Sequence, residues 1–179
     1  EEYWELSVGG PEFEKSCPQV SLVMSPYADL DSDYFIFTIN HATFPNFVAG
    51  GLQLQRWHND QVMEVDDAPE QGVLNHDDEV ISWKQRMWLD DGLLKMKVFD
   101  GTSQTWGSFG GWYELRIHHP TSLARLNDYR PAVSINESGI TYAGNRVSSL
   151  VLKKLIWKTD DNQYFELNAP IDIDTDIDP

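Results

Sequence analysis

Hydrophobic and polar residues alternate in short runs along most of the chain, and Gly, Asn, Asp and Pro separate these runs. Alternation with a period of two is typical of a strand that buries one face, whereas a helix repeats its apolar positions every three to four residues. No long stretch shows the helical period. The pattern predicts strands at residues 19–24, 34–40, 52–57, 62–65, 80–89, 93–99, 113–118, 132–135, 147–157 and 164–167.

Short polar turns join several of these runs. Asp90, Asp91 and Gly92 link residues 80–89 to 93–99, and Asp-Gly is among the strongest signals of a β-hairpin. The strands follow one another without room for crossover helices, so we expect antiparallel pairing. The predicted fold class is all-β, as a two-sheet antiparallel β-sandwich of the jelly-roll or lectin-like kind.

The length of 179 residues suits one domain, which we place at residues 1–170. Residues 171–179 read Ile-Asp-Ile-Asp-Thr-Asp-Ile-Asp-Pro. We expect an acidic C-terminal tail or linker there, because dense like charge opposes strand pairing. An edge strand with Ile171 and Ile173 on one face is the alternative interpretation.

The chain is strongly acidic, with 29 acidic and 13 basic residues and a formal charge of −16. Such a charge disfavours binding to nucleic acid over most of the surface. No apolar run approaches the ~20 residues of a membrane helix, so we expect no membrane insertion. The chain begins at Glu1 rather than Met, which fits a processed N-terminus. The missing signal peptide is therefore not evidence for the cytosol. We separately expect an extracellular or cell-surface location, and membership of a larger multidomain or assembled protein.

Residues 80–99 are the most informative segment, because the two faces of this predicted hairpin differ in character. One face is apolar and is predicted to pack between the sheets: Ile81, Trp83, Gln85, Met87, Leu89, Leu94, Met96 and Val98. The other face holds four cations with large aromatic residues: Lys84, Arg86, Trp88, Lys95, Lys97 and Phe99. Like charges that face each other across strands repel, so something should offset them.

Two interpretations of this cationic face remain open. Nearby Asp and Glu side chains could neutralise the cations, as on a solvated sheet face with exposed salt bridges. Alternatively, the face binds an anionic sugar, since ammonium and guanidinium groups bind sulfate or carboxylate and aromatic rings stack on sugars.

A glycine-rich aromatic loop follows the hairpin at residues 100–112, with four Gly and three aromatic residues. Glycine permits tight turns, so the loop can present Trp106 or Trp112 outward as part of a sugar subsite. The alternative is that Trp106 and Phe109 turn inward and cap the sandwich.

No complete catalytic motif occurs, so no catalytic residue is assigned. Glu64, Asp66 and Glu70 are similar to the Glu-x-Asp-x-x-Glu strand of laminarinase-like glycoside hydrolases, but the third carboxylate is one residue late and Pro69 interrupts the strand. Asp29, Asp31 and Asp33 lie in one predicted loop, and carboxylate oxygens are calcium ligands. They are the candidate site for a structural calcium ion.

The long hairpin at 80–99, the Trp-rich strands and the late strand at 145–157 together resemble the concanavalin A-like lectin and glucanase sandwiches. This resemblance rests on architecture, and it implies glycan binding, often with a structural calcium ion.

The leading functional hypothesis is a non-catalytic carbohydrate-binding domain of a secreted or surface protein, with an acidic polysaccharide as the candidate ligand. A polysaccharide-active enzyme, either a glycoside hydrolase or a lyase, is the first alternative. A structural or adhesion module is the second.

Overall fold

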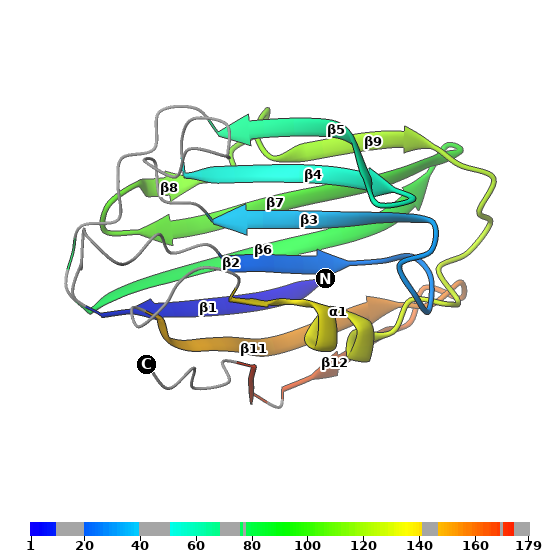
Figure 1. Cartoon of the computed structure of the whole chain (residues 1–179). Helices are drawn as coiled ribbons and strands as arrows, with labels where there is room; N and C mark the ends of the chain where they lie inside the picture. Colours follow the sequence, from blue (N-terminus) through cyan, green and yellow to red (C-terminus); the bar gives the residue numbers. More distant parts are fainter. Residues whose placement is uncertain are drawn as a thin grey trace.

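The computed structural model describes residues 1–9, 20–39, 51–68, 76, 78–140, 147–168 and 170–173. Within these residues two antiparallel sheets face each other, with the five-stranded sheet in front of the eight-stranded sheet in Figure 1. The prediction of an all-β, two-sheet antiparallel sandwich is confirmed.

The eight-stranded sheet has β1 near its middle, in the order β12-β11-β1-β6-β7-β8. Strand β7 also pairs with β9, and β11 also pairs with β13. Its strands are β1 (Glu2–Val8), β6 (Glu79–Asp90), β7 (Leu93–Ser103), β8 (Gly107–Phe109), β9 (Arg116–Pro120), β11 (Val147–Lys158), β12 (Tyr164–Leu167) and β13 (Ile171–Asp172).

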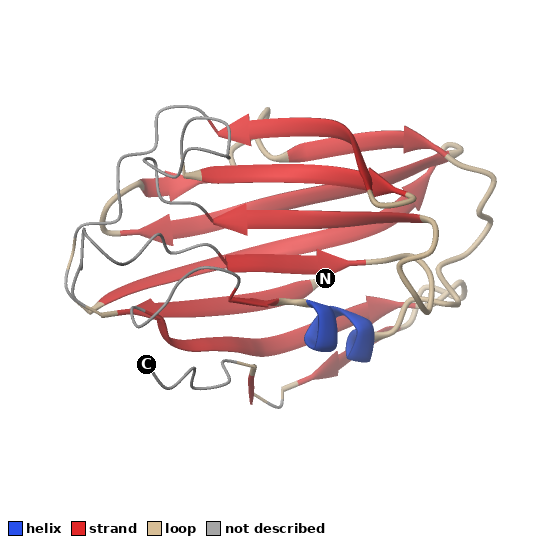
Figure 2. Ribbon diagram, viewed as in Figure 1, coloured by secondary structure: helices blue, strands red, loops and turns tan. Residues whose placement is uncertain are grey.

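The five-stranded sheet has the order β10-β2-β3-β4-β5. Its strands are β2 (Val20–Met24), β3 (Asp33–Ile39), β4 (Leu52–His58), β5 (Gln61–Ala68) and β10 (Gly139–Ile140). A short helix, α1 (Pro131–Glu137), lies beside this sheet (Figure 2). No helix in the described residues is long and apolar enough to cross a membrane.

The core lies between the two sheets and is built from alternate residues of their strands. Trp83 of β6 meets Phe37 of β3 edge-on, with ring centroids 5.7 Å apart. Both side chains are almost fully buried, and each such burial contributes roughly 2–3 kcal/mol. The apolar face predicted for the hairpin is buried except for the partly exposed Leu89. Alternation therefore predicted correctly which side of β6 and β7 faces the core.

Several elements differ from the predictions, among them the short strands β8 and β10, which were not predicted. Strand β1 was not predicted, although its residues alternate between buried and partly exposed positions. The strand expected at 132–135 is wrong, because these residues lie in α1. Pro131 begins this helix, and proline favours the first helical turn since its φ is already fixed there. The strand expected at 113–118 begins only at Arg116, because Leu115 has a positive φ of 51°.

The acidic segment that starts at residue 171 continues the sheet. Ile171 and Asp172 pair with β11, and the Ile173 amide donates a 2.8 Å hydrogen bond to the Leu150 carbonyl. Ile173 also packs against the core. The remaining tail, from residue 174, lies outside the described residues.

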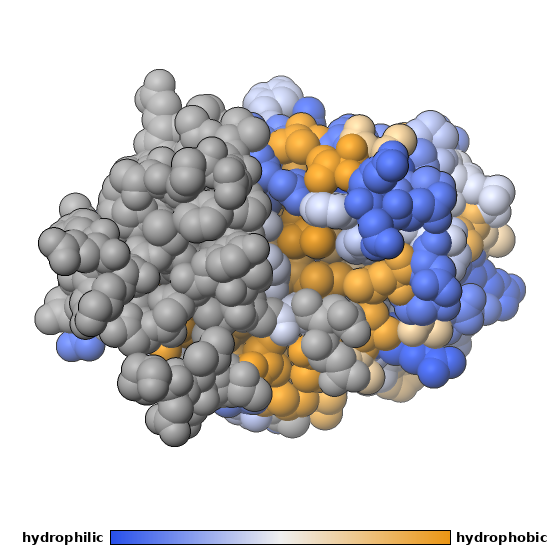
Figure 3. Space-filling view, viewed as in Figure 1, coloured by the Kyte–Doolittle hydropathy of each residue, from blue (hydrophilic) through white to orange (hydrophobic). Residues whose placement is uncertain are grey.

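The two outer faces of the sandwich differ. Figure 3 views the side of the five-stranded sheet, where hydrophobic residues reach the surface among polar ones. Strand β5 contributes the exposed Val62, Met63 and Val65. The outer face of the eight-stranded sheet lies on the opposite side and is cationic.

Candidate ligand-binding face

The outer face is the side of the eight-stranded sheet that points away from the core. It gathers more than half of the chain's 13 Lys and Arg residues: Lys84, Arg86, Lys95, Lys97, Arg116, Lys153 and Lys154. They come from four strands, β6, β7, β9 and β11. Basic residues are therefore concentrated on the outer face of this acidic protein.

Strand register places three of these cations in one line. Arg86 of β6 pairs with Lys97 of β7, and Lys97 pairs with Arg116 of β9. We call these three residues the cation row. Neighbouring strands lie roughly 4.8 Å apart, so the row crosses the sheet over roughly 10 Å.

Each member of the cation row lies over an aromatic ring. The charged group is 5.2 Å from the ring centroid for Arg86 over Trp88, and 5.7 Å for Lys97 over Trp112. For Arg116 over Tyr113 the distance is 5.1 Å. These distances suit cation–π attraction, which orients a cation without neutralising its charge. Within the described part of the chain, no carboxylate forms an ion pair with a member of the row.

The other cations of the face have carboxylate partners, and we call them the paired cations. The ion pairs are Lys84–Asp100 at 2.8 Å, Lys95–Asp90 at 2.6 Å, Lys153–Glu5 at 2.9 Å and Lys154–Glu166 at 2.7 Å. The interpretation that acidic side chains neutralise the hairpin therefore holds for Lys84 and Lys95. It does not hold for Arg86 and Lys97.

These contacts lower the pKa values of two of the acidic partners. The hydrogen bond and charge of Lys95 lower the pKa of Asp90. Hydrogen bonds from Lys154 and Asn168 likewise lower the pKa of Glu166. Both carboxylates are thus held in the ionised form that compensates their cations.

The loop between β8 and β9 positions two aromatic rings of the face. Gly110 has a positive φ of 73°, and a Cβ there would lie 2.7 Å from the Phe99 Cα atom, so only glycine fits. Leu115 is fully buried, and its carbonyl accepts a 2.9 Å hydrogen bond from the Val98 amide. With both ends held against β7, Trp112 and Tyr113 point outward and are each 75% exposed.

Arg116 is fixed at the edge where the two sheets meet. Its backbone amide donates a 2.7 Å hydrogen bond to Asp66 Oδ2 of β5. Its guanidinium Nη1 donates to the Trp112 carbonyl at 3.4 Å. The third cation of the row is therefore held at its backbone by β5 and at its guanidinium by the loop between β8 and β9.

The structure brings together most of the predicted ligand-binding residues and separates one. Arg86, Trp88, Lys97 and Trp112 lie on the outer face, and the paired Lys84 and Lys95 flank them. Trp106 lies elsewhere, because it packs partly buried against the core and meets Phe109 edge-on, with ring centroids 6.2 Å apart.

Sequence reasoning missed Arg116, Tyr113 and Tyr3. Tyr3 of β1 lies between two paired cations, with its ring 5.0 Å from Lys84 Nζ and 5.3 Å from Lys154 Nζ. Burial and a hydrogen bond to Glu1 raise the pKa of Tyr3 to about 12. The alternation of β1 was a usable signal for Tyr3, whereas no local pattern joins Arg116 to the hairpin.

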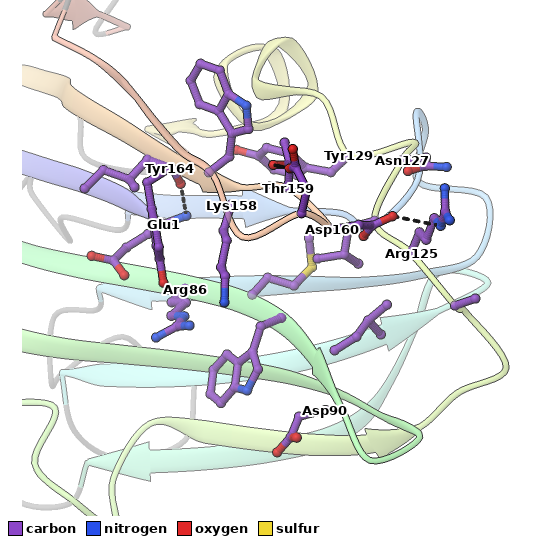
Figure 4. Close-up of a pocket in the computed structure, with 18 residues that line it drawn as sticks. Glu1, Arg86, Asp90, Arg125, Asn127, Tyr129, Lys158, Thr159, Asp160 and Tyr164 are labelled. Carbon is purple, nitrogen blue, oxygen red and sulfur yellow. Dashed lines mark hydrogen bonds and ion pairs between the residues drawn. The ribbon is translucent and has the colours of Figure 1, made fainter.

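A groove of about 970 Å³ adjoins the β6 end of the cation row (Figure 4). It lies between the ends of β6 and β11, and Arg86 and Trp88 line it together with Lys158. Arg125 and Asp160 form a 3.0 Å ion pair there, drawn as a dashed line in Figure 4. The groove and the outer face thus share two residues.

The proposed calcium ligands are engaged in other contacts. Asp29 Oδ1 accepts a 3.3 Å hydrogen bond from the Asp31 amide. Asp33 Oδ1 accepts a 2.7 Å hydrogen bond from Arg56, which supplies a compensating charge. Among the described residues, no group of three or more His, Cys, Asp or Glu side chains is arranged to hold a metal ion. Calcium binding stays a prediction.

The carboxylates considered for catalysis have structural contacts. Glu64 lies 3.8 Å from Arg56 Nε, and Asp66 holds the Arg116 amide. Glu70 lies outside the described residues.

In comparisons with known proteins, no family model, no curated protein and no solved structure matches this chain. The resemblance to concanavalin A-like sandwiches therefore stays a prediction based on architecture.

Proposed function

We propose that this chain is a non-catalytic carbohydrate-binding domain that holds an acidic polysaccharide on the outer face of its eight-stranded sheet. The observation that supports this most is the cation row, which has no carboxylate partner within the described residues. Like charges directly opposite one another on neighbouring strands destabilise a sheet. An anionic ligand that lies on the row removes this repulsion.

The aromatic residues of the face support a sugar rather than a simple anion. Trp112 and Tyr113 are 75% exposed, which is unusual for side chains with so much apolar surface. Such rings can stack on the apolar face of a sugar while the adjacent cations bind its carboxylate or sulfate groups. The face therefore combines the two kinds of contact that an acidic sugar requires.

The remaining surface restricts where an acidic ligand can bind. The chain has a charge of −16, so a polyanion is repelled by the protein as a whole and attracted to the cations of the outer face. An extracellular or cell-surface location, where acidic polysaccharides occur, belongs to the same proposal. A structural calcium ion at Asp29, Asp31 and Asp33 is a separate part of the same proposal.

The test compares two triple variants by calorimetry on polyuronates and sulfated polysaccharides. Arg86→Gln, Lys97→Gln and Arg116→Gln together remove the cation row. Lys84→Gln, Lys95→Gln and Lys153→Gln together remove the same amount of charge from paired cations of the same face. We expect the first variant to bind at least about tenfold more weakly than wild type, since each lost charge-assisted contact costs about 1.5–3 kcal/mol. The second should bind within about threefold of wild type.

Two results would overturn the proposal. One is a wild-type protein that binds none of these acidic polysaccharides. The other is an equal loss of affinity in both triple variants, which would show a general charge effect. Circular dichroism spectra and thermal unfolding confirm that each variant is folded before its affinity is interpreted.

A further inference from the structure

The uncompensated charge of the outer face forms a stripe and not a round patch. Along β6 and β7 the neighbouring positions on the same face hold Lys84 and Lys95, each neutralised by an ion pair. Residues two apart on a strand are roughly 6.6 Å from each other. Positive charge therefore extends across the strands, from Arg86 to Arg116, and is interrupted along them.

A carboxylate lies at each end of the stripe. At the β1 end, strand register places Glu1 next to Arg86, since Glu2 pairs with Gln85. The Glu1 carboxylate accepts a 2.8 Å hydrogen bond from Tyr3, so an acidic group closes this end. At the other end, β9 pairs with β7 and with no further strand among the described residues. Beyond Arg116, the Asp66 carboxylate of β5 accepts the 2.7 Å hydrogen bond of the Arg116 amide, so the row is bounded by a carboxylate at each end.

The spacing of the cations restricts the ligand. One cation occurs about every 5 Å, because the strands are roughly that far apart. Duplex DNA has a negative charge about every 1.7 Å, so most of its charges would face the acidic remainder of the surface without a partner. A linear polysaccharide with one carboxylate on each sugar has charges about one sugar ring apart, which is close to the strand spacing.

We infer that the outer face binds a linear polysaccharide with one negative charge on each sugar, and that this polymer lies across the strands along the cation row. The inference rests on the proposed function, and it adds the charge spacing of the ligand and its direction. Trp88, Trp112 and Tyr113 lie beside the three cations and provide apolar surface for successive sugar rings.

The charge spacing that the ligand requires is tested with wild-type protein and polymers of known charge. The probes are polygalacturonate, alginate, the same polygalacturonate with increasing methyl esterification, heparin and single-stranded oligothymidine. We expect affinity to fall steeply once esterification breaks up runs of adjacent carboxylates, and heparin and oligothymidine to bind more weakly per charge than the polyuronates. Tighter binding of heparin than of either polyuronate would overturn the inference while leaving the proposed function in place.

The direction in which the bound polymer crosses the sheet is tested with galacturonate oligomers of increasing length. In wild type, affinity should rise with each sugar until the row is covered and then level off. In Arg116→Gln the rise should stop about one sugar earlier, because the terminal cation of the row is missing. Lys84→Gln, a matched variant in a neighbouring line, should keep the wild-type profile. If Lys84→Gln shortens the profile and Arg116→Gln does not, the polymer lies along the strands and the inference is wrong.

Discussion

Both faces of the eight-stranded sheet contain ionisable side chains, but these side chains differ in whether they have partners. On the inner face, Glu2 is fully buried and accepts hydrogen bonds from Trp4 at 2.9 Å, Gln85 at 2.6 Å and Tyr129 at 2.7 Å. Burial, together with the nearby Glu2, raises the pKa of Tyr129, so this phenol stays a donor. On the outer face, the cation row has no carboxylate partner among the described residues.

This difference follows from solvent access. A buried polar group without a partner costs about 1–3 kcal/mol, so the inner face must satisfy Glu2 completely. An exposed cation stays hydrated, and forming or losing a surface ion pair changes stability by about 0–1 kcal/mol. The outer face can therefore keep unpaired cations at little cost. Charge inside this sheet serves stability, whereas the unpaired charge outside it remains free for a ligand.

The largest expected effect comes from removing the buried carboxylate. Glu2→Ala leaves the donors of Trp4, Gln85 and Tyr129 without an acceptor, and we expect the free energy of unfolding to fall by about 3 kcal/mol or more. Glu2→Gln keeps one acceptor oxygen and should lose less. Urea denaturation measures both variants. A loss below about 1 kcal/mol for Glu2→Ala would contradict the role assigned to the inner face.

A charge reversal in the centre of the cation row should separate stability from binding. In Lys97→Glu the new carboxylate faces Arg86 and Arg116, so repulsion becomes attraction and stability should rise by about 0.5 kcal/mol. Affinity for polyuronates should fall at least about tenfold, because the ligand loses a cation and meets an anion. Thermal unfolding and calorimetry test the two effects. Lys97→Gln is the control and should lie between wild type and Lys97→Glu in both measurements.

Glu79 is a second buried carboxylate, and its contribution to the free energy of unfolding should depend on pH. Burial by itself raises its pKa, but hydrogen bonds from Ser103 and Thr105 outweigh burial and lower the pKa below the usual 4.5. A lowered pKa means that this stabilisation is complete above pH 4.5 and is lost as the pH falls through the folded-state value.

The difference in unfolding free energy between wild type and Glu79→Gln should therefore be constant near neutral pH and shrink below pH 4.5. Denaturation curves across this range test it. A difference that stays constant down to pH 3 would mean that the charge of Glu79 contributes nothing.

The smallest expected effect comes from releasing paired cations. Asp90→Asn and Asp100→Asn free Lys95 and Lys84 from their partners, which widens the stripe. We expect affinity for polyuronates to rise by roughly two- to threefold at low salt, in line with the small energies of surface ion pairs. Asp91→Asn is the control for each single variant, since it changes the net charge by the same one unit without breaking either pair. An equal gain in the control would show that only net charge matters.

Local patterns were enough to predict much of the fold. The alternation of residues 80–99 predicted both the buried face of the hairpin and the cationic one. The same alternation of buried and partly exposed positions is present in β1. The segment 132–135 misled the prediction, since a short apolar run does not by itself distinguish a strand from a helix.

The candidate site was predictable only in part. Arg86, Trp88 and Lys97 lie within one hairpin, so local sequence brings them together. Arg116 joins them through pairing of β9 with β7, and Trp112 is placed by the close approach of Gly110 to Phe99. The pairing of β9 with β7 has no signature in the residues around it, whereas the glycines of residues 100–112 did predict a tight loop with an outward Trp112.

By itself, the sequence determined which side of each strand is apolar, because side chains alternate with a period of two whatever the partner strand is. Only the tertiary structure decided which cations are neighbours and which are neutralised. Those outcomes depend on register between strands distant in the chain, such as β1 with β6 and β7 with β9. The sequence therefore predicted that this face carries several cations. It did not predict which of them are paired cations and which form the cation row.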